Sequence, residues 1–114
     1  MDSSTEWDVR FTAAAREHIQ EIIEYLLERE GREFARSFTS ALRNEATERL
    51  KTFPFKGRTV PELETLTKEF REIRFTSYRL IYRANPQTRT VRILLIAHIK
   101  RDIEDLLLST ILGL

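Results

Sequence analysis

The strongest constraint on the fold is a change of hydrophobic period partway along the chain. Between residues 13 and 53, apolar residues recur at the three- and four-residue spacing of an α-helix. Between residues 70 and 98, apolar and polar residues alternate as they do in strands. The links between these strand-like runs are too short for crossover helices, so the strands form an antiparallel meander. Helices and strands segregated in this way indicate an α+β fold.

The helical half of the chain predicts one short strand followed by two helices. Residues 7–11 alternate in the manner of a strand, and Thr12 suits the N-cap of the helix that follows. Gly31 suits the end of the first helix, and Pro54 ends the second. Because the link at Gly31 is short, the two helices form an antiparallel hairpin. His18 has charged neighbours on the first helix and is expected at the surface.

Strict alternation divides the side chains of the later strands between the two faces of the sheet. In the strand at 77–83, one face carries Tyr78, Leu80 and Tyr82, and the other carries Arg79, Ile81 and Arg83. In the strand at 91–98, one face carries Val91, Ile93, Leu95 and Ala97, and the other carries Arg92, Leu94, Ile96 and His98. Asp102 suits the cap of a last helix. We therefore predict a small antiparallel sheet with a helix hairpin on one face, in the order β-α-α-β-β-β-α.

Charge is distributed unevenly, although the formal net charge is only +1. Between Lys68 and Arg101 there are nine basic and two acidic residues, a net charge of +7. The segments before and after this region each carry a net charge of −3. A basic strand region between acidic segments is typical of a surface that binds a polyanion or an acidic partner.

Composition excludes several kinds of site. With 114 residues, we expect a single domain over 1–114, with a poorly ordered N-terminus at 1–6. There are no cysteines, which excludes disulfides, thiol nucleophiles and thiolate metal ligands. His18 and His98 are too few and too far apart for a metal site, so we expect no metal and no cofactor. No apolar run is long enough to span a bilayer and no signal peptide is evident, so we expect no membrane partner and a cytoplasmic location.

Four separated segments carry a further pattern. They are Val9–Thr12 with the helix after it, Phe53–Leu63, the strand pair Arg71–Arg83, and His98–Asp102. In their order and spacing these segments resemble the RelE/ParE superfamily of type II toxin–antitoxin toxins, over about residues 7–107. One departure is that the usual glycine after the histidine is Ile99 here.

The resemblance implies a growth-inhibiting, plasmid-stabilising toxin that is neutralised by a cognate antitoxin wrapped around it. RelE-like members cleave mRNA in the ribosome without a metal, whereas ParE-like members poison DNA gyrase. The nucleases have a lysine-rich strand and a late tyrosine. Here Glu72 lies in the matching strand and no tyrosine follows Tyr82. We therefore favour a gyrase poison acting through a basic sheet face, with a ribosome-dependent, metal-free mRNA endoribonuclease as the alternative.

For the site, the resemblance singles out Arg79, and then Arg74. If the protein is a nuclease, we expect Arg79, Arg74 and His98 to be catalytic, because arginine stabilises a phosphorane and histidine donates a proton. For binding, we expect the basic residues Arg71, Arg74, Arg79, Arg83, Arg92, Lys100 and Arg101. The alternative is that these arginines only keep an open sheet face solvated, that His98 merely closes its strand, and that Glu72 forms an ion pair.

The antitoxin is expected to bind apolar surfaces. These are a groove beside Phe34 and Phe38 on the helix hairpin, and Leu106, Leu107 and Ile111 on the last helix. The alternative for the last helix is core packing alone, since a helix that is apolar all round must bury more than one side. A toxin–antitoxin hetero-oligomer is the expected assembly. A nucleic-acid-binding module without toxic chemistry and a degenerate toxin that keeps only the antitoxin-binding fold also fit the pattern.

Overall fold

The computed structural model describes residues 6–113, except for the side chain of Leu112. Along this part of the chain the elements are β1 (Asp8–Phe11), α1 (Ala13–Glu30), α2 (Arg32–Thr52), β2 (Arg58–Thr59), the 3-10 turn η2 (Pro61–Leu63), β3 (Phe70–Phe75), β4 (Tyr78–Asn85), β5 (Thr90–His98) and α3 (Glu104–Leu112). The expected order of elements is confirmed. Two short elements are additions to it, the two-residue strand β2 and the three-residue turn η2. The expectation about the first six residues falls mostly on 1–5, which lie outside the described residues.

The sheet has the strand order β1-β5-β4-β3-β2. The pairs from β2 to β5 are antiparallel, but β1 runs parallel to β5, with Asp8 opposite Thr90 and Phe11 opposite Ile93. The sheet is therefore mixed. Strand β1 can pair parallel to β5 because the connection between β1 and the antiparallel strands is long and contains two helices.

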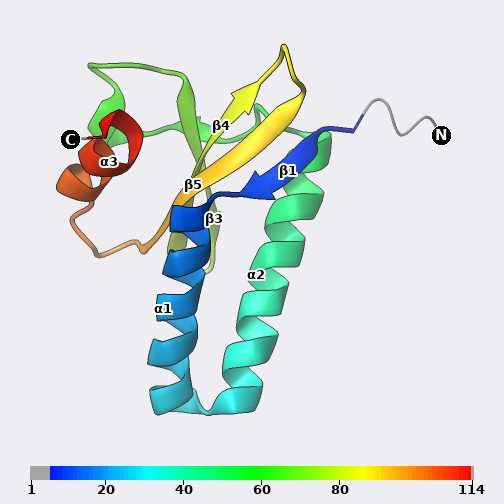
Figure 1. Ribbon diagram of the computed structural model, residues 1–114, viewed down its shortest axis with the longest axis vertical. Coiled ribbons are helices and arrows are strands. Elements are labelled where there is room, and N and C mark those ends of the chain that lie inside the picture. The colour runs from blue at the N-terminus through cyan, green and yellow to red at the C-terminus, as the bar shows by residue number, and fades with distance from the viewer. Residues whose placement is uncertain (1–5, 114) are drawn as a thin grey trace.

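The two faces of the sheet have separate cores. The hairpin of α1 and α2 covers one face and packs on Leu80, Tyr82 and Ile93, among others (Figure 1). On the other face, α3 and the segment around η2 enclose a second cluster, which includes Ile81 and Leu107. The hairpin side is called the hairpin face below, and the other side is called the α3 face. Both faces are partly covered, so few strand positions remain open to solvent.

Local signals set the ends of α1 as expected and the start of α3 to within one residue. Thr12 Oγ1 accepts a hydrogen bond from the Ala15 N–H at 3.2 Å, which caps α1. Gly31 follows the last residue of α1 with a φ of 93°, a conformation that glycine adopts without strain. The N-cap of α3 is Ile103 rather than the expected Asp102, although Asp102 Oδ1 accepts from the backbone N–H of Glu104, the first residue of α3, at 3.2 Å.

A β-bulge changes the faces of β5. Ile81 lies opposite Leu95, but the next residue, Tyr82, lies opposite Ile93, so Leu94 is extra. The strict alternation expected for β5 is therefore wrong beyond Leu94. Ile96 packs in the hairpin-face core, whereas Leu95 belongs to the α3-face core.

His18 is buried, so the expectation that it lies at the surface is wrong. Its Nδ1 accepts the backbone N–H of Ile96 at 3.2 Å. The physical reason is the short β1, which ends opposite Ile93 and leaves the N–H of Ile96 to a side chain from α1. Burial lowers the pKa of His18, and the charge of Arg101 lowers it further, while Glu21 and Glu17 raise it.

Candidate functional site

Four arginines share the α3 face of the sheet, and they are called the arginine face below. The register pairs Arg74 with Arg79 and Arg83 with Arg92 across neighbouring strands. Directly opposed residues point to the same side of a sheet. The bulge lies beyond Arg92 and leaves its orientation unchanged. The fold therefore brings these four positive charges together on one face of the sheet, as the alternation in the sequence predicts.

Arg79 is buried and fully occupied by carboxylates. Its Nη1 and Nη2 each donate to a carboxylate oxygen of Glu62 at 2.7 Å. Its Nε and Nη2 also donate to Glu72, with the shortest contact at 2.5 Å. Pairing with Glu62 raises the pKa of Arg79, and the same pairing lowers the pKa of Glu62. Every nitrogen of this guanidinium thus has a carboxylate partner.

Glu72 anchors this cluster from within the sheet. Its side chain is 1% exposed and also accepts from Arg58 Nη2 at 3.1 Å. A buried carboxylate needs such partners, because an isolated charge is costly to remove from water. The ion pair expected for Glu72 exists, but its partners are Arg58 and Arg79 rather than its sequence neighbours.

The remaining members of the arginine face are more open. Arg74 and Arg92 are exposed. Arg83 Nη2 meets Glu69 at 3.1 Å, and both side chains are at least half exposed, so this pair holds Arg83 only weakly. Arg83 and Arg92 also line a hollow of about 310 Å³ beside α3. These three cations are free to meet an acidic surface.

The other basic residues singled out from sequence lie elsewhere. Arg71 points to the hairpin face opposite Tyr82, donates to the carbonyl of Gly57 at 2.9 Å and lies over the ring of Phe55. Lys100 and Arg101 are exposed in the turn after β5, beyond the arginine face. The structure thus divides the seven predicted binding residues among three places.

His98 also lies apart from the arginine face. It is paired with Tyr78 across β4 and β5, and the two rings meet edge to face at 5.5 Å on the hairpin face. Its Nδ1 accepts the backbone N–H of Lys100 at 3.1 Å. The bulge places His98 on this side, opposite to the side that strict alternation predicts. Arg74, Arg79 and His98 are therefore not brought together.

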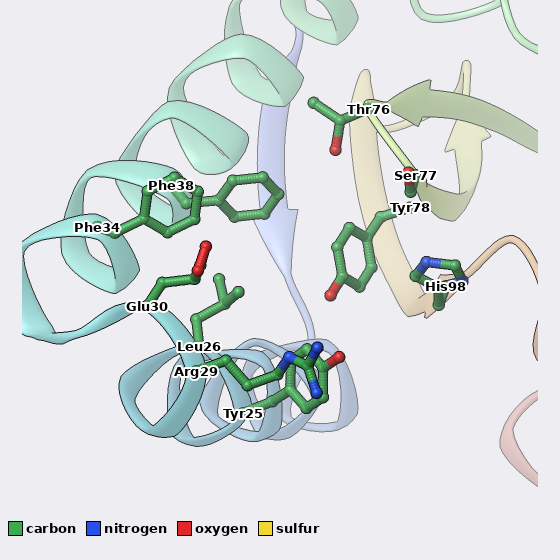
Figure 2. A pocket seen from close by; sticks show the side chains of 10 residues that line it. All are labelled: Tyr25, Leu26, Arg29, Glu30, Phe34, Phe38, Thr76, Ser77, Tyr78 and His98. Atoms are coloured by element: carbon green, nitrogen blue, oxygen red, sulfur yellow. The ribbon is translucent and has the colours of Figure 1, made fainter.

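An aromatic groove lies where the tip of the helix hairpin approaches the turn between β3 and β4 (Figure 2). It is defined here by Tyr25, Phe34, Phe38, Tyr78 and His98, and its volume is about 640 Å³. Phe34 stacks on Phe38, which meets Tyr78 edge to face at 5.8 Å. Figure 2 shows helix residues on one side of the space and the sheet residues Tyr78 and His98 on the other.

Sequence reasoning found two members of this groove and missed the others. Phe34 and Phe38 stand out because they belong to an apolar stripe on α2. Tyr25 lies six residues before Gly31, and an exposed aromatic residue this near a helix end is a signal that the sequence could have offered. Tyr78 and His98 join the groove only through strand pairing, which no local pattern reveals.

The three residues expected on the last helix differ in exposure. Leu107 is fully buried in the α3-face core. Leu106 and Ile111 are partly buried and pack against the same cluster. A partner cannot touch the side chain of Leu107 unless α3 moves.

The sequence itself matches a known family. A protein-family model described as "ParE toxin of type II toxin-antitoxin system, parDE" matches residues 9–103. The chain belongs to the ParE toxin family. The matched range runs from β1 to the start of α3 and includes both candidate surfaces, so the resemblance to RelE/ParE toxins is confirmed. No curated protein sequence matches this ParE-family chain.

Solved structures show the same fold. A chain of the chromosomal ParDE system from P. aeruginosa is 15% identical, with a TM-score of 0.68, over 84% of this chain and 99% of that chain. The Mycobacterium tuberculosis RelBE2 toxin–antitoxin complex contains a chain that is 25% identical, with a TM-score of 0.60, over 82% and 91%. The isolated E. coli RelE toxin is 14% identical, with a TM-score of 0.55, over 84% and 87%.

Two further findings concern residues 6–113. Within this range, no helix is long and apolar enough to cross a membrane. The same residues contain no group of three or more histidine, aspartate or glutamate side chains placed to hold a metal ion.

Proposed function

We propose that this ParE-family toxin acts by poisoning DNA gyrase, and that it contacts the enzyme through the exposed members of the arginine face, Arg74, Arg83 and Arg92. The observation that carries the proposal is the separation of these cations from His98. Metal-free RNA cleavage needs a proton acceptor and a proton donor beside the reacting phosphate. Among residues 6–113, both histidines lie on the hairpin face, away from the arginines.

The carboxylates near the arginine face support the same conclusion. Glu72 accepts hydrogen bonds from Arg58 and Arg79 and is 1% exposed, so it is not free to take a proton from a ribose hydroxyl. Glu62 is held by Arg79 in the same way. Arginine-rich surfaces without a proton-transfer group suit protein recognition, in which complementary charge governs orientation and association rate.

A purified system separates gyrase poisoning from mRNA cleavage. We expect the toxin, gyrase and ATP to trap cleaved plasmid DNA, which is measured as linear DNA after denaturation and proteolysis. Arg83→Ala with Arg92→Ala should lower the amount of trapped DNA at least about tenfold if the two contacts contribute roughly 1.4 kcal/mol together. Both positions are exposed, so the double variant should keep the wild-type circular dichroism spectrum.

The competing function has its own readout. Ribosome-dependent cleavage predicts codon-phased cuts in mRNA in a purified translation system, and these cuts should vanish in Arg74→Ala. That result, together with intact DNA in the gyrase reaction, would overturn the gyrase proposal and establish the endoribonuclease alternative.

We also propose that a cognate antitoxin neutralises this toxin in the cytoplasm as a hetero-oligomer. The ParDE and RelBE2 structures are described as a toxin–antitoxin system and a toxin–antitoxin complex, which supports the proposal. The aromatic groove offers exposed rings of Tyr25 and Phe34 beside Arg29 and Glu30. An amphipathic segment with apolar anchors fits such a surface, because buried aromatic contacts supply most of the energy of an interface.

A further inference from the structure

A second positively charged site lies at the β2 edge of the sheet. The end of α2, the loop after it and the later part of β3 surround a hollow of about 420 Å³. The cations that line it are Arg49, Lys56, Arg58 and Arg74, which together are called the cationic hollow. Arg74 is the only one that belongs to the arginine face as well. Arg83 and Arg92 do not line it.

The charge of the cationic hollow is only partly balanced. Glu72 is the acid in its wall, and its carboxylate is already shared between Arg58 and Arg79. Arg49 Nη1 donates to the backbone carbonyl of Arg74 at 2.9 Å, which fixes one cation over the strand edge without neutralising it. Like charges that line one hollow repel each other, and a bound anion relieves that repulsion.

An exposed aromatic ring adjoins the cationic hollow. Phe53 is 57% exposed and lines a second hollow of about 270 Å³. The two hollows share Arg49, Lys56 and Ile73 as wall residues, so they are neighbours. Lys56 Nζ lies 5.2 Å from the centre of the Phe53 ring. A cation and an exposed aromatic ring therefore lie side by side, with the Lys56 ammonium group over one face of the ring.

We infer that this site binds single-stranded nucleic acid, with phosphates on the cations of the hollow and an unpaired base stacked on Phe53. This combination of a cationic groove and an aromatic platform is how proteins hold single strands. The inference goes beyond gyrase poisoning, and its site shares only Arg74 with the surface proposed to contact gyrase.

Two other occupants fit less well. Protein–protein interfaces are enriched in arginine but depleted of lysine, and here Lys56 lines both hollows. A DNA duplex keeps its bases stacked on each other, so it can use the cations but not the ring of Phe53.

The position of the hollow leaves the aromatic groove free. The groove begins at the N-terminal end of α2, and Phe53 follows its C-terminal end. A helix of 21 residues is about 30 Å long. A protein partner in the groove and a nucleic acid in the hollow can therefore be bound together.

Fluorescence anisotropy with labelled oligonucleotides of about ten nucleotides, within the span of one single-strand module, tests the inference. Four probes of equal length are compared: single-stranded RNA, single-stranded DNA, an abasic strand and a duplex. We expect both single strands to bind more tightly than the abasic strand and the duplex. The RNA and DNA probes identify which sugar the site prefers, and either preference is compatible with the inference.

The variants separate stacking from charge. Phe53→Ala should weaken binding of the single strands about 5- to 150-fold and leave binding of the abasic strand unchanged. Lys56→Gln should weaken all four probes and reduce the slope of log affinity against log salt by about one. Phe34→Ala is the matched control, because that ring is 48% exposed but lies in the aromatic groove. This variant should bind all four oligonucleotide probes as tightly as the wild-type protein does.

Three results would overturn the inference. The first is equal binding of the abasic and normal strands by the wild-type protein. The second is unchanged binding of single strands by a folded Phe53→Ala variant, and the third is no binding at about 50 mM salt, where phosphate contacts are strong. Because gyrase poisoning is read from Arg83 and Arg92, failure here and failure of that proposal are distinguishable.

Discussion

At the scale of single residues, Arg79 is the residue whose role changes most between sequence and structure. The resemblance to the family predicts a role for Arg79 in the site, but its guanidinium is taken up by Glu62 and Glu72. Breaking a buried ion pair by removing one partner is strongly destabilising, because the other charge stays behind without compensation. Loss of toxicity in an Arg79 variant therefore reports on folding before it reports on function.

We expect Arg79→Ala to lower the free energy of unfolding by about 3–5 kcal/mol, measured by urea denaturation. Adding Glu72→Met to Arg79→Met should recover most of this loss, because the double change removes both buried charges. An Arg79→Ala protein as stable as wild type would show that Arg58 alone satisfies Glu72.

His18 gives the fold a dependence on pH. Burial lowers the pKa of His18 below its ordinary value of 6.5, so the unfolded chain binds more protons than the folded one as pH falls below about 6.5. Stability should therefore fall with decreasing pH in this range, at no more than about 1.4 kcal/mol per pH unit for one proton. Denaturation of wild type and His18→Gln at several pH values checks this, and parallel curves would contradict it.

At the scale of helices and strands, the sequence predicts those features that depend only on residues close together in the chain. Thr12 and Gly31 mark the ends of α1 because caps and left-handed glycines act within one turn. The bulge at Leu94 escapes prediction because Leu94, Leu95 and Ile96 are all apolar and fit either face. The faces of β5 are settled only by its pairing with β4 and by the cores on both sides, and the place of His98 follows from that pairing.

The loop between α2 and β3 depends on one close approach. A Cβ on Gly57 would lie 2.6 Å from both the carbonyl oxygen of Glu72 and the hydroxyl of Tyr82. Gly57→Ala should therefore lose the Gly57 N–H bond to Tyr82 and lower the free energy of unfolding by about 1–3 kcal/mol. Lys56→Ala, in the same loop but exposed, should stay within about 0.5 kcal/mol. Equal stability of both variants would mean that the loop shifts without cost.

At the scale of the whole molecule, the arginine face and the aromatic groove lie on opposite sides of the sheet. This arrangement explains how much of the candidate site could be predicted from the sequence. The sequence could predict that the arginines of the α3 face share one side of the sheet, because that prediction needs only the two-residue period of a strand. It could not show that α3 and η2 cover that face, nor that Glu62 reaches Arg79 from a loop 17 residues earlier. Contacts of that kind arise from packing between elements that are distant in sequence.

The burial of each apolar side chain decides which residues can be used to test antitoxin binding. Leu107 is fully buried, so Leu107→Asp would disrupt the α3-face core and would not report on an interface. Phe34 is a better probe, because its exposed ring lines the aromatic groove.

We expect Phe34→Ala to weaken binding of the proposed cognate antitoxin by at least about tenfold, as truncation of an interface anchor does. Arg92→Ala should change affinity less and act mainly on the association rate, because rim charges steer encounter. Surface plasmon resonance at low and moderate salt measures both the affinity and the association rate, with Leu66→Ala as the control for an exposed apolar residue outside the groove. If Arg92→Ala costs more affinity than Phe34→Ala and added salt abolishes the complex, the antitoxin binds the arginine face by charge rather than the aromatic groove.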